Sequence, residues 1–156
     1  MIEIPIPGRE TLRLAFLVLD YNGTLARDGR ILEGVKERLQ ALAESLEIHV
    51  LTADTFGSVQ SELTGTPCRL FVIPRENQVQ AKASYVESLG FDRAVCIGNG
   101  RNDRLMLEQA ALGIAVILQE GAFPKTVSAA DVVTHSILDA LDLLLFPLRL
   151  TATLRT

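Results

Sequence analysis

The stretch LVLDYNGTL, residues 17–25, decides how the rest of the chain is interpreted. The segment Leu14–Leu19 is apolar without interruption and ends at Asp20, and Gly23 and Thr24 follow closely. An apolar run of this kind is typical of a strand that is buried on both faces of a parallel sheet. Asp20 would then stand at the carboxyl end of the strand, which is the edge where open α/β sheets bind ligands. The same residues also suit an ordinary turn in which Asp20 only caps the backbone.

The composition is that of a folded protein without the features of nucleic-acid-binding or membrane proteins. The chain has 156 residues, of which 48% are hydrophobic, and its formal net charge is −4. This length suits a single domain over residues 1–156, and the acidic balance argues against nucleic acid as a partner. No apolar run is long enough to cross a bilayer, and the first residues do not form a signal peptide. Cys68 and Cys96 lack metal-ligand spacing, so we expect both to stay reduced in a cytoplasmic protein. Because the chain has neither a long basic run nor a long apolar run, we expect no membrane partner.

Strand-like and helix-like segments alternate at short spacing. The predicted strands cover residues 2–4, 11–19, 48–52, 70–73, 94–97, 114–117 and 130–133, and the predicted helices cover residues 35–46, 58–63, 78–89, 103–111 and 137–145. An Asp-Gly pair within residues 26–31 indicates a hairpin. The tail over residues 146–156 fits no element clearly. This order predicts a single three-layer, Rossmann-like α/β domain with a mainly parallel central sheet.

Polar residues follow three of the predicted strands where each strand ends. These residues are Asp20, Thr52 and Asn99, and the loop that begins at Asn99 continues to Asp103. Because the carboxyl ends of parallel strands meet at one edge of a sheet, we expect Asp20, Thr52 and Asn99 to lie close together. A single residue of this kind is usually a turn former, but a converging set indicates a binding site.

The residue types in this set favour phosphoryl transfer. A carboxylate such as Asp20 can attack phosphorus and form an aspartyl-phosphate. The transferred group is highly charged, so Lys82 can supply a cation, and the Thr52 hydroxyl and the backbone at Gly23 can supply hydrogen-bond donors. Carboxylate and amide oxygens in the same region, including that of Asn99, are ligands that Mg²⁺ prefers.

Four segments of the chain resemble, in order and spacing, the four motifs of the haloacid dehalogenase (HAD) superfamily. They are LDYNGTL, LTAD, the helix that contains Lys82, and GNGRND. The sequence GNGRNDRLML, residues 98–107, is similar to the family pattern G-D-G-x-N-D-x-x-M-L, and the resemblance extends approximately from Leu14 to Val133. LTAD and the pattern around Lys82 look most like the phosphorylation domain of P-type ATPases, here without transmembrane helices.

The resemblance implies a Mg²⁺-dependent phosphohydrolase or phosphotransferase with Asp20 as its nucleophile. The positions that it implies to be catalytic are Asp20 and Asn22. The residues implied to bind phosphate or substrate are Gly23, Thr52, Ala53, Lys82 and Asn102. The residues implied to hold the metal ion are Asp20, Asn22 through its backbone carbonyl, Asn99 and Asp103.

Two positions depart from the family pattern. HAD phosphatases carry an Asp two residues after the nucleophile, where it protonates the leaving group and activates water, but this chain has Asn22. An amide cannot exchange a proton in this way, so we expect slow turnover. Asn99 replaces a second Asp and should weaken the binding of Mg²⁺. Asp54 either compensates for this charge or caps the helix over residues 55–63, and capping is the favoured interpretation.

The spacing of the motifs excludes a separate cap domain. The intervals from Asp20 to Thr52 and from Thr52 to Lys82 are each too short for one, so the site should be open. We expect the substrate to be a phosphorylated small molecule or protein, and a second copy of the chain could cover the site in a homo-oligomer. The alternative from another functional class is a catalytically degenerate HAD domain that binds phosphate or a protein.

Overall fold

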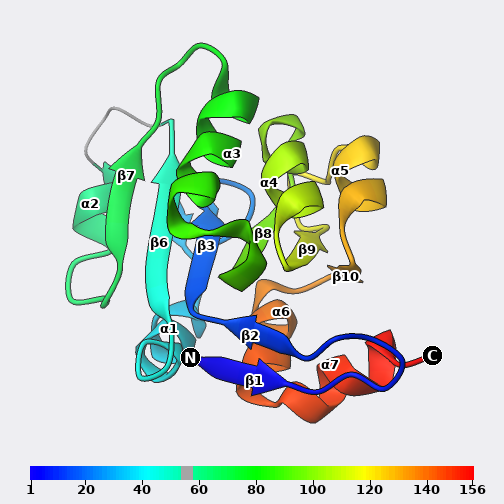
Figure 1. Ribbon diagram of the computed structural model, residues 1–156. Coiled ribbons are helices and arrows are strands. Elements are labelled where there is room, and N and C mark those ends of the chain that lie inside the picture. The colour runs from blue at the N-terminus through cyan, green and yellow to red at the C-terminus, as the bar shows by residue number, and fades with distance from the viewer. Residues whose placement is uncertain (54–57) are drawn as a thin grey trace.

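The computed structural model describes residues 1–53 and 58–156, and its centre is a six-stranded parallel sheet (Figure 1). The strand order is β10-β9-β8-β3-β6-β7. The strands are β3 (Phe16–Asp20), β6 (Glu47–Thr52), β7 (Arg69–Val72), β8 (Ala94–Gly98), β9 (Leu112–Val116) and β10 (Val132–Thr134). Because β3 lies between β6 and β8, Asp20 ends a strand at the middle of the sheet. The predicted α/β architecture is confirmed.

Helices cover both faces of the sheet. One face packs against α3 (Gln78–Leu89), α4 (Arg104–Gln109) and α5 (Pro124–Ala129), and the other against α1 (Val35–Leu42), α2 (Ser58–Glu62) and α6 (Ile137–Leu145). Helix α7 (Pro147–Leu154) packs against α6 and β1 (Ile2–Ile4). Short 3₁₀ helices cover Phe91–Arg93 and Arg101–Asp103. Successive residues of β3 serve the two layers, since Val18 joins the core on the α3 side while Leu17 and Leu19 join the core under α1. This alternation explains why the β3 sequence is apolar up to Asp20.

The N-terminal segment differs from the prediction. β1 (Ile2–Ile4) and β2 (Leu12–Leu14) form a separate two-stranded antiparallel sheet, so residues 11–19 are not one strand and residues 2–4 do not extend the central sheet. The division falls at Ala15, whose N–H donates to the Arg93 carbonyl at 2.8 Å and whose carbonyl accepts from the Glu47 N–H at 2.9 Å. These partners belong to other segments, so the backbone changes sheets at Ala15 although the sequence stays apolar.

The hairpin at residues 26–31 is confirmed, and the C-terminal tail, which the sequence left unassigned, is mostly helical. β4 (Ala26–Arg27) and β5 (Arg30–Ile31) are joined by Asp28 and Gly29, with φ values of 51° and 79°. Both values lie in the left-handed region that a two-residue type I′ turn requires. The tail forms α7, and the short helix α5 was not predicted. Helix α4 begins after a 3₁₀ turn and ends at Gln109, two residues before the predicted end at Ala111.

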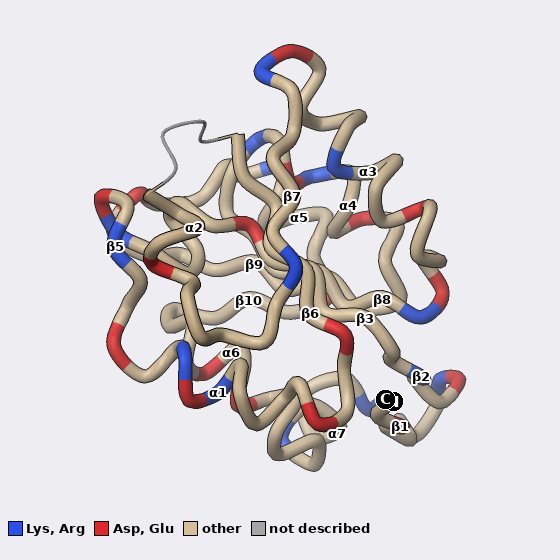
Figure 2. Tube along the Cα trace, turned by 90° about the vertical axis from the view of Figure 1, so that its left-hand side faces the viewer, with Lys and Arg blue, Asp and Glu red and all other residues tan. Residues whose placement is uncertain are grey.

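The surface of the described residues is mixed in charge. Figure 2 shows basic and acidic positions interspersed along helices and loops. Within the described ranges, none of the helices is both long enough and apolar enough to cross a membrane.

Candidate active site

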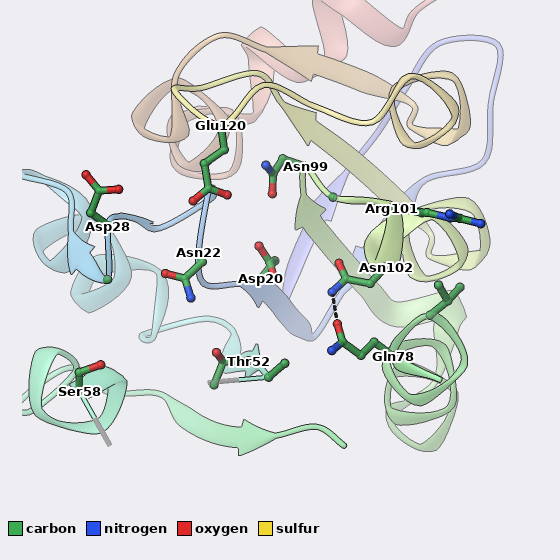
Figure 3. Close-up of a pocket in the computed structure, with 14 residues that line it drawn as sticks. Asp20, Asn22, Asp28, Thr52, Ser58, Gln78, Asn99, Arg101, Asn102 and Glu120 are labelled. Atoms are coloured by element: carbon green, nitrogen blue, oxygen red, sulfur yellow. Dashed lines mark hydrogen bonds between the residues drawn. The ribbon is translucent and has the colours of Figure 1, made fainter. Parts of the chain in front are cut away.

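Three strand ends meet at one pocket, as the sequence predicted. Asp20 at the end of β3, Thr52 at the end of β6 and Asn99 directly after β8 all line a pocket of about 940 Å³ (Figure 3). Asp20 is only 8% exposed, so its carboxylate lies at the bottom of the pocket. The pocket is open to solvent, because no cap domain stands between the segments that line it in the described part of the chain.

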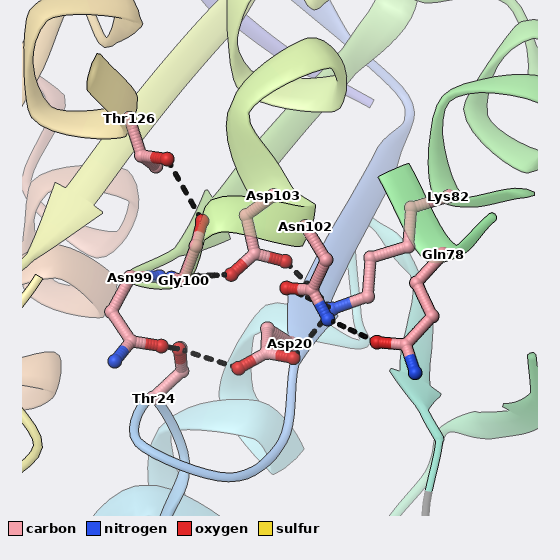
Figure 4. A network of polar contacts seen from close by, with 9 residues as sticks. All are labelled: Asp20, Thr24, Gln78, Lys82, Asn99, Gly100, Asn102, Asp103 and Thr126. Atoms are coloured by element: carbon pink, nitrogen blue, oxygen red, sulfur yellow. Dashed lines mark hydrogen bonds and ion pairs between the residues drawn. The ribbon is translucent and has the colours of Figure 1, made fainter. Parts of the chain in front are cut away.

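Lys82 bridges two carboxylates beneath this pocket (Figure 4). The residue belongs to α3, is 1% exposed, and its ammonium lies 2.6 Å from Asp20 Oδ1 and 2.6 Å from Asp103 Oδ1. A buried ammonium is stable only when it is paired and hydrogen-bonded, and here two anions meet that requirement. The contacts therefore fix the position of the cation beside the Asp20 carboxylate.

The protonation equilibria of this cluster reflect burial and neighbouring charge. Burial, together with the nearby Asp103 carboxylate, raises the pKa of Asp20 to about 6, and the opposing attraction of Lys82 and the hydrogen bond from Thr24 only partly offset this. Burial lowers the pKa of Lys82, but the charges of Asp20 and Asp103 outweigh it and hold that pKa above its ordinary value. Lys82 therefore stays charged at neutral pH.

Asp103 is fully buried and does not face the pocket. Its Oδ1 accepts from Lys82, and its Oδ2 accepts from the backbone N–H groups of Asn99 at 3.0 Å and Gly100 at 2.8 Å. Gly98 leaves room for this arrangement, because a methyl group there would lie 2.5–2.7 Å from atoms of the Asp103 side chain. These contacts show Asp103 orienting Lys82 and the loop, while its predicted role as a metal ligand stays a prediction.

The turn after β3 brings Thr24 and Gly23 against Asn99. The Thr24 hydroxyl lies 3.1 Å from Asp20 Oδ2 and 3.4 Å from Asn99 Oδ1, and it can donate to either oxygen. Gly23 has a φ of 78°, and a methyl group there would collide with the side chains of Asn99 and Glu120. The absence of a side chain at Gly23 thus allows the loops to close around the Asp20 carboxylate.

The other predicted residues lie around the same opening. Asn22 is exposed and Ala53 half-buried, and both line the pocket. Asn102 accepts a long hydrogen bond of 3.5 Å from Lys82 and donates at 2.7 Å to Gln78 Oε1. Asp54 lies outside the described residues, so neither of its two interpretations is tested.

Several residues that line the pocket were missed in the sequence. Gln78 lies at the start of α3, and Arg101 lies in the loop after β8. Glu120 follows β9, which is the next strand of the sheet, so the same rule of strand ends could have found it. Asp28 was not missed in the same way, because the sequence places it at the exposed tip of the expected hairpin, and it also lines the pocket.

The donor atoms around Asp20 suit a hard cation, although few of them are acidic. Among residues 1–53 and 58–156, no group of three or more His, Cys, Asp and Glu side chains is arranged to hold a metal ion. Of the residues implied to hold the metal ion, Asp20, Asn22 and Asn99 line the pocket, and the last two carry amides. A set of one carboxylate and neutral oxygens fits Mg²⁺ chemically but offers little charge.

Comparisons by sequence find two relatives and no family model. The chain is 54% identical over 63 residues to an uncharacterized protein of Methanocaldococcus jannaschii, a match that covers 40% of this chain and 68% of the relative. It is 62% identical over 39 residues to a second uncharacterized protein of the same organism, covering 25% of this chain and 89% of that relative. No family model matches the chain.

Comparisons by structure find HAD hydrolases. A 3-deoxy-D-manno-octulosonate 8-phosphate phosphatase from Moraxella catarrhalis, in complex with magnesium, phosphate and KDO, matches with a TM-score of 0.71 and 16% identity over 85% of this chain and 86% of that one. The cobalt-bound phosphatase of the same type from Haemophilus influenzae matches with a TM-score of 0.72 and 14% identity over 92% and 94%. A subfamily III A HAD hydrolase from Legionella pneumophila matches at 0.73 and 18% identity over 91% and 87%. At these identities the likeness establishes the fold.

Proposed function

We propose that this chain, which has the capless HAD fold and belongs to one family with two uncharacterized Methanocaldococcus jannaschii proteins, is a phosphohydrolase or phosphotransferase. The observation that carries the proposal is the placement of Asp20. Its carboxylate ends the central strand, meets an open pocket, and is held by Lys82 on one oxygen and Thr24 on the other. A carboxylate fixed in this way can act as a nucleophile toward phosphorus.

The reaction consists of two displacements at phosphorus. In the first, an Asp20 oxygen forms a bond to phosphorus, and the bond between phosphorus and the leaving oxygen breaks with its electron pair. Lys82 lies beside the acceptor oxygen and opposes the charge of the transferred group, as cations do in phosphoryl transfer. In the second, the oxygen of water or another acceptor forms a bond to phosphorus, the bond between Asp20 and phosphorus breaks with its electron pair on the carboxylate, and the proton of the acceptor passes to solvent.

A divalent cation fits this site, in agreement with the metal-bound phosphatases of the same fold. Asp20, the backbone carbonyl of Asn22 and the side-chain oxygen of Asn99 would hold it. Such an ion would reduce the repulsion between the carboxylate and the incoming phosphate. Asp103 is also implied to hold the metal ion; in the structure its oxygens accept from Lys82 and the loop backbone, and its role as a ligand stays a prediction.

Asn22 sets the expected rate. It occupies the position from which an acid would protonate the leaving group, and its amide has no proton to exchange near neutral pH. The loss of general acid–base catalysis at one position costs about 10²–10⁴-fold. We therefore propose a slow enzyme whose aspartyl-phosphate persists, as the resemblance to P-type ATPase phosphorylation domains also implies.

The substrate is proposed to be a phosphorylated small molecule or protein. The pocket volume of about 940 Å³ and its open side admit either, and the residues that line it include Arg101, Gln78 and Ser58. The second candidate, a binding module without turnover, is favoured by Asn22 and by the small negative charge around the metal position.

Phosphorylation of Asp20 tests the proposal. The wild-type protein is incubated with acetyl phosphate or p-nitrophenyl phosphate and Mg²⁺, and the phosphoprotein is trapped in acid and treated with hydroxylamine. The expected result is an acid-stable, hydroxylamine-labile adduct that is absent from Asp20→Asn and retained by Glu87→Gln, an exposed acid on α3. A wild type with neither adduct nor turnover would favour the binding module. Asn22→Asp is a sharper second variant than a change at Asn99, because the Asn99 amide donates a structural hydrogen bond.

A further inference from the structure

Glu120 brings a carboxylate to the side of the pocket where this chain has Asn99 in place of the Asp of the family pattern. The residue lies in a turn between β9 and α5, which closes with the Gly121 N–H donating to the Leu118 carbonyl at 3.0 Å. Figure 3 shows its carboxylate pointing into the space between Asn22 and Asn99. Glu120 is exposed and lines the pocket, so solvent and ligands can reach it.

Asn99 fastens this turn to the site through two hydrogen bonds. Its side-chain Nδ2 donates to the Gly121 carbonyl at 3.0 Å, and its backbone carbonyl accepts from the Phe123 N–H at 2.8 Å. A carboxylate at position 99 could not make the first bond, because it has no proton to donate at neutral pH. The Asn99 amide therefore has a structural role, which is to hold the turn at Gly121.

The Asn99 and Glu120 side chains meet over Gly23. A methyl group built on Gly23 would collide with Glu120 Oε2 and would lie 2.6 Å from Asn99 Nδ2 and 3.0 Å from Asn99 Oδ1. Both side chains thus approach the same side of Gly23, the residue that follows Asn22 in the sequence. An amide beside the Glu120 carboxylate causes no like-charge repulsion, whereas a carboxylate in the same place would.

We infer that Asn99 and Glu120 act as a pair in which Asn99 positions the turn and Glu120 supplies the negative charge that attracts the divalent cation beside Asp20. This inference rests on the proposed function, since it concerns the cation of that site. Glu120, in the turn after β9, supplies the negative charge that an Asp at position 99 would have supplied. The Asn99 amide positions the turn that carries Glu120 by its hydrogen bond to the Gly121 carbonyl. Asn99 is a positioning residue in this arrangement.

Binding of Mn²⁺, followed by the electron paramagnetic resonance of the free ion, tests the pair without any need for turnover. Glu120→Gln should weaken Mn²⁺ binding about tenfold, within the range of groups next to metal ligands, and leave the thermal midpoint unchanged. Glu87→Gln removes the same charge from the exposed side of α3 and should bind Mn²⁺ as the wild type does.

The double change separates a pair from two independent residues. Asn99→Asp alone should change Mn²⁺ affinity by less than about threefold, because the new carboxylate repels Glu120 and loses the bond to Gly121. In the Glu120→Gln background, the same Asn99→Asp change should raise the affinity about tenfold and restore it to near the wild-type value. Unchanged binding by Glu120→Gln, or an equal gain from Asn99→Asp in both backgrounds, would overturn the inference.

The two proposals fail in different ways. A protein that forms the Asp20 adduct but binds Mn²⁺ independently of Glu120 keeps the proposed function and loses the pair. A protein that forms no adduct, yet shows the coupled Mn²⁺ affinities, keeps the pair and loses the proposed function.

Discussion

Replacing Asp20 by Asn is expected to stabilise the metal-free protein at neutral pH. Burial and the neighbouring Asp103 raise the pKa of Asp20 from 3.8 to about 6 in the folded state, despite the opposing effect of Lys82. A pKa difference of this size corresponds to about 3 kcal/mol of unfavourable free energy for keeping Asp20 ionised in the folded protein at pH 7. Asn removes that cost but interacts more weakly with Lys82, so we expect a gain of about 1–3 kcal/mol in the free energy of unfolding.

The gain should depend on pH in a defined direction. The folded-state pKa of Asp20 is higher than the unfolded-state value, so the folded protein binds the extra proton between pH 3.8 and about 6. The wild type therefore loses the Asp20 contribution to stability as the pH rises through about 6, whereas the Asp20→Asn variant has no such contribution to lose. The difference between Asp20→Asn and wild type should be near zero at about pH 4 and complete above about pH 7.

Urea unfolding followed by circular dichroism at several pH values measures this difference. In a chain of this length, about 1–3 kcal/mol corresponds to a rise of about 2–12 °C in the thermal midpoint. Asp28→Asn is the matched control, because Asp28 lines the same pocket at an exposed position and Asn tolerates its left-handed conformation. A destabilised Asp20→Asn, or a gain of equal size at acidic and neutral pH, would refute the argument that burial of the charge dominates.

Three further changes test other parts of the site. Lys82→Met leaves Asp20 and Asp103 buried without their cation and should cost about 3–5 kcal/mol at neutral pH in urea unfolding, with part of the loss recovered by adding Asp20→Asn. Asn22→Asp should speed the loss of the Asp20 phosphoryl group about 10²–10⁴-fold in a pulse-chase measurement, and an unchanged rate would remove position 22 from the mechanism. Gly98→Ala places a methyl group 2.5–2.7 Å from the Asp103 side chain and should cost about 1–3 kcal/mol in thermal unfolding.

The convergence of the site was predictable because it follows from the direction of the strands. Asp20, Thr52 and Asn99 each follow an apolar run closely, and parallel pairing of β3 with β6 and β8 places those ends together. Asp103 was harder to interpret. Its sequence context suggests a metal ligand, but its contacts depend on Lys82 arriving from α3, which the pattern around Asp103 does not contain.

Two elements escaped prediction for reasons of local sequence. The apolar run through Ala15 gives no sign of the division between β2 and β3, which depends on distant backbone partners. In the tail, Leu148, Leu150 and Leu154 alternate with polar residues as in a strand. The structure forms a helix instead, with Leu150 buried, Leu154 half-buried one turn later, and Leu148 83% exposed. The spacing of four residues was the informative one.

The contacts of Asp103 explain how Lys82 can serve Asp20 through a whole reaction. In the proposed aspartyl-phosphate, the Asp20 side chain is no longer a free carboxylate, and Asp103 is the carboxylate that remains beside Lys82. Asp103 keeps its contact of 2.6 Å to Lys82 because its other oxygen is fixed by the backbone of Asn99 and Gly100. Burial alone would lower the pKa of Lys82, and the contact with Asp103 is one of the two that oppose this effect. The Lys82 ammonium can then contact the phosphoryl oxygens of the proposed intermediate while it keeps its ion pair with Asp103.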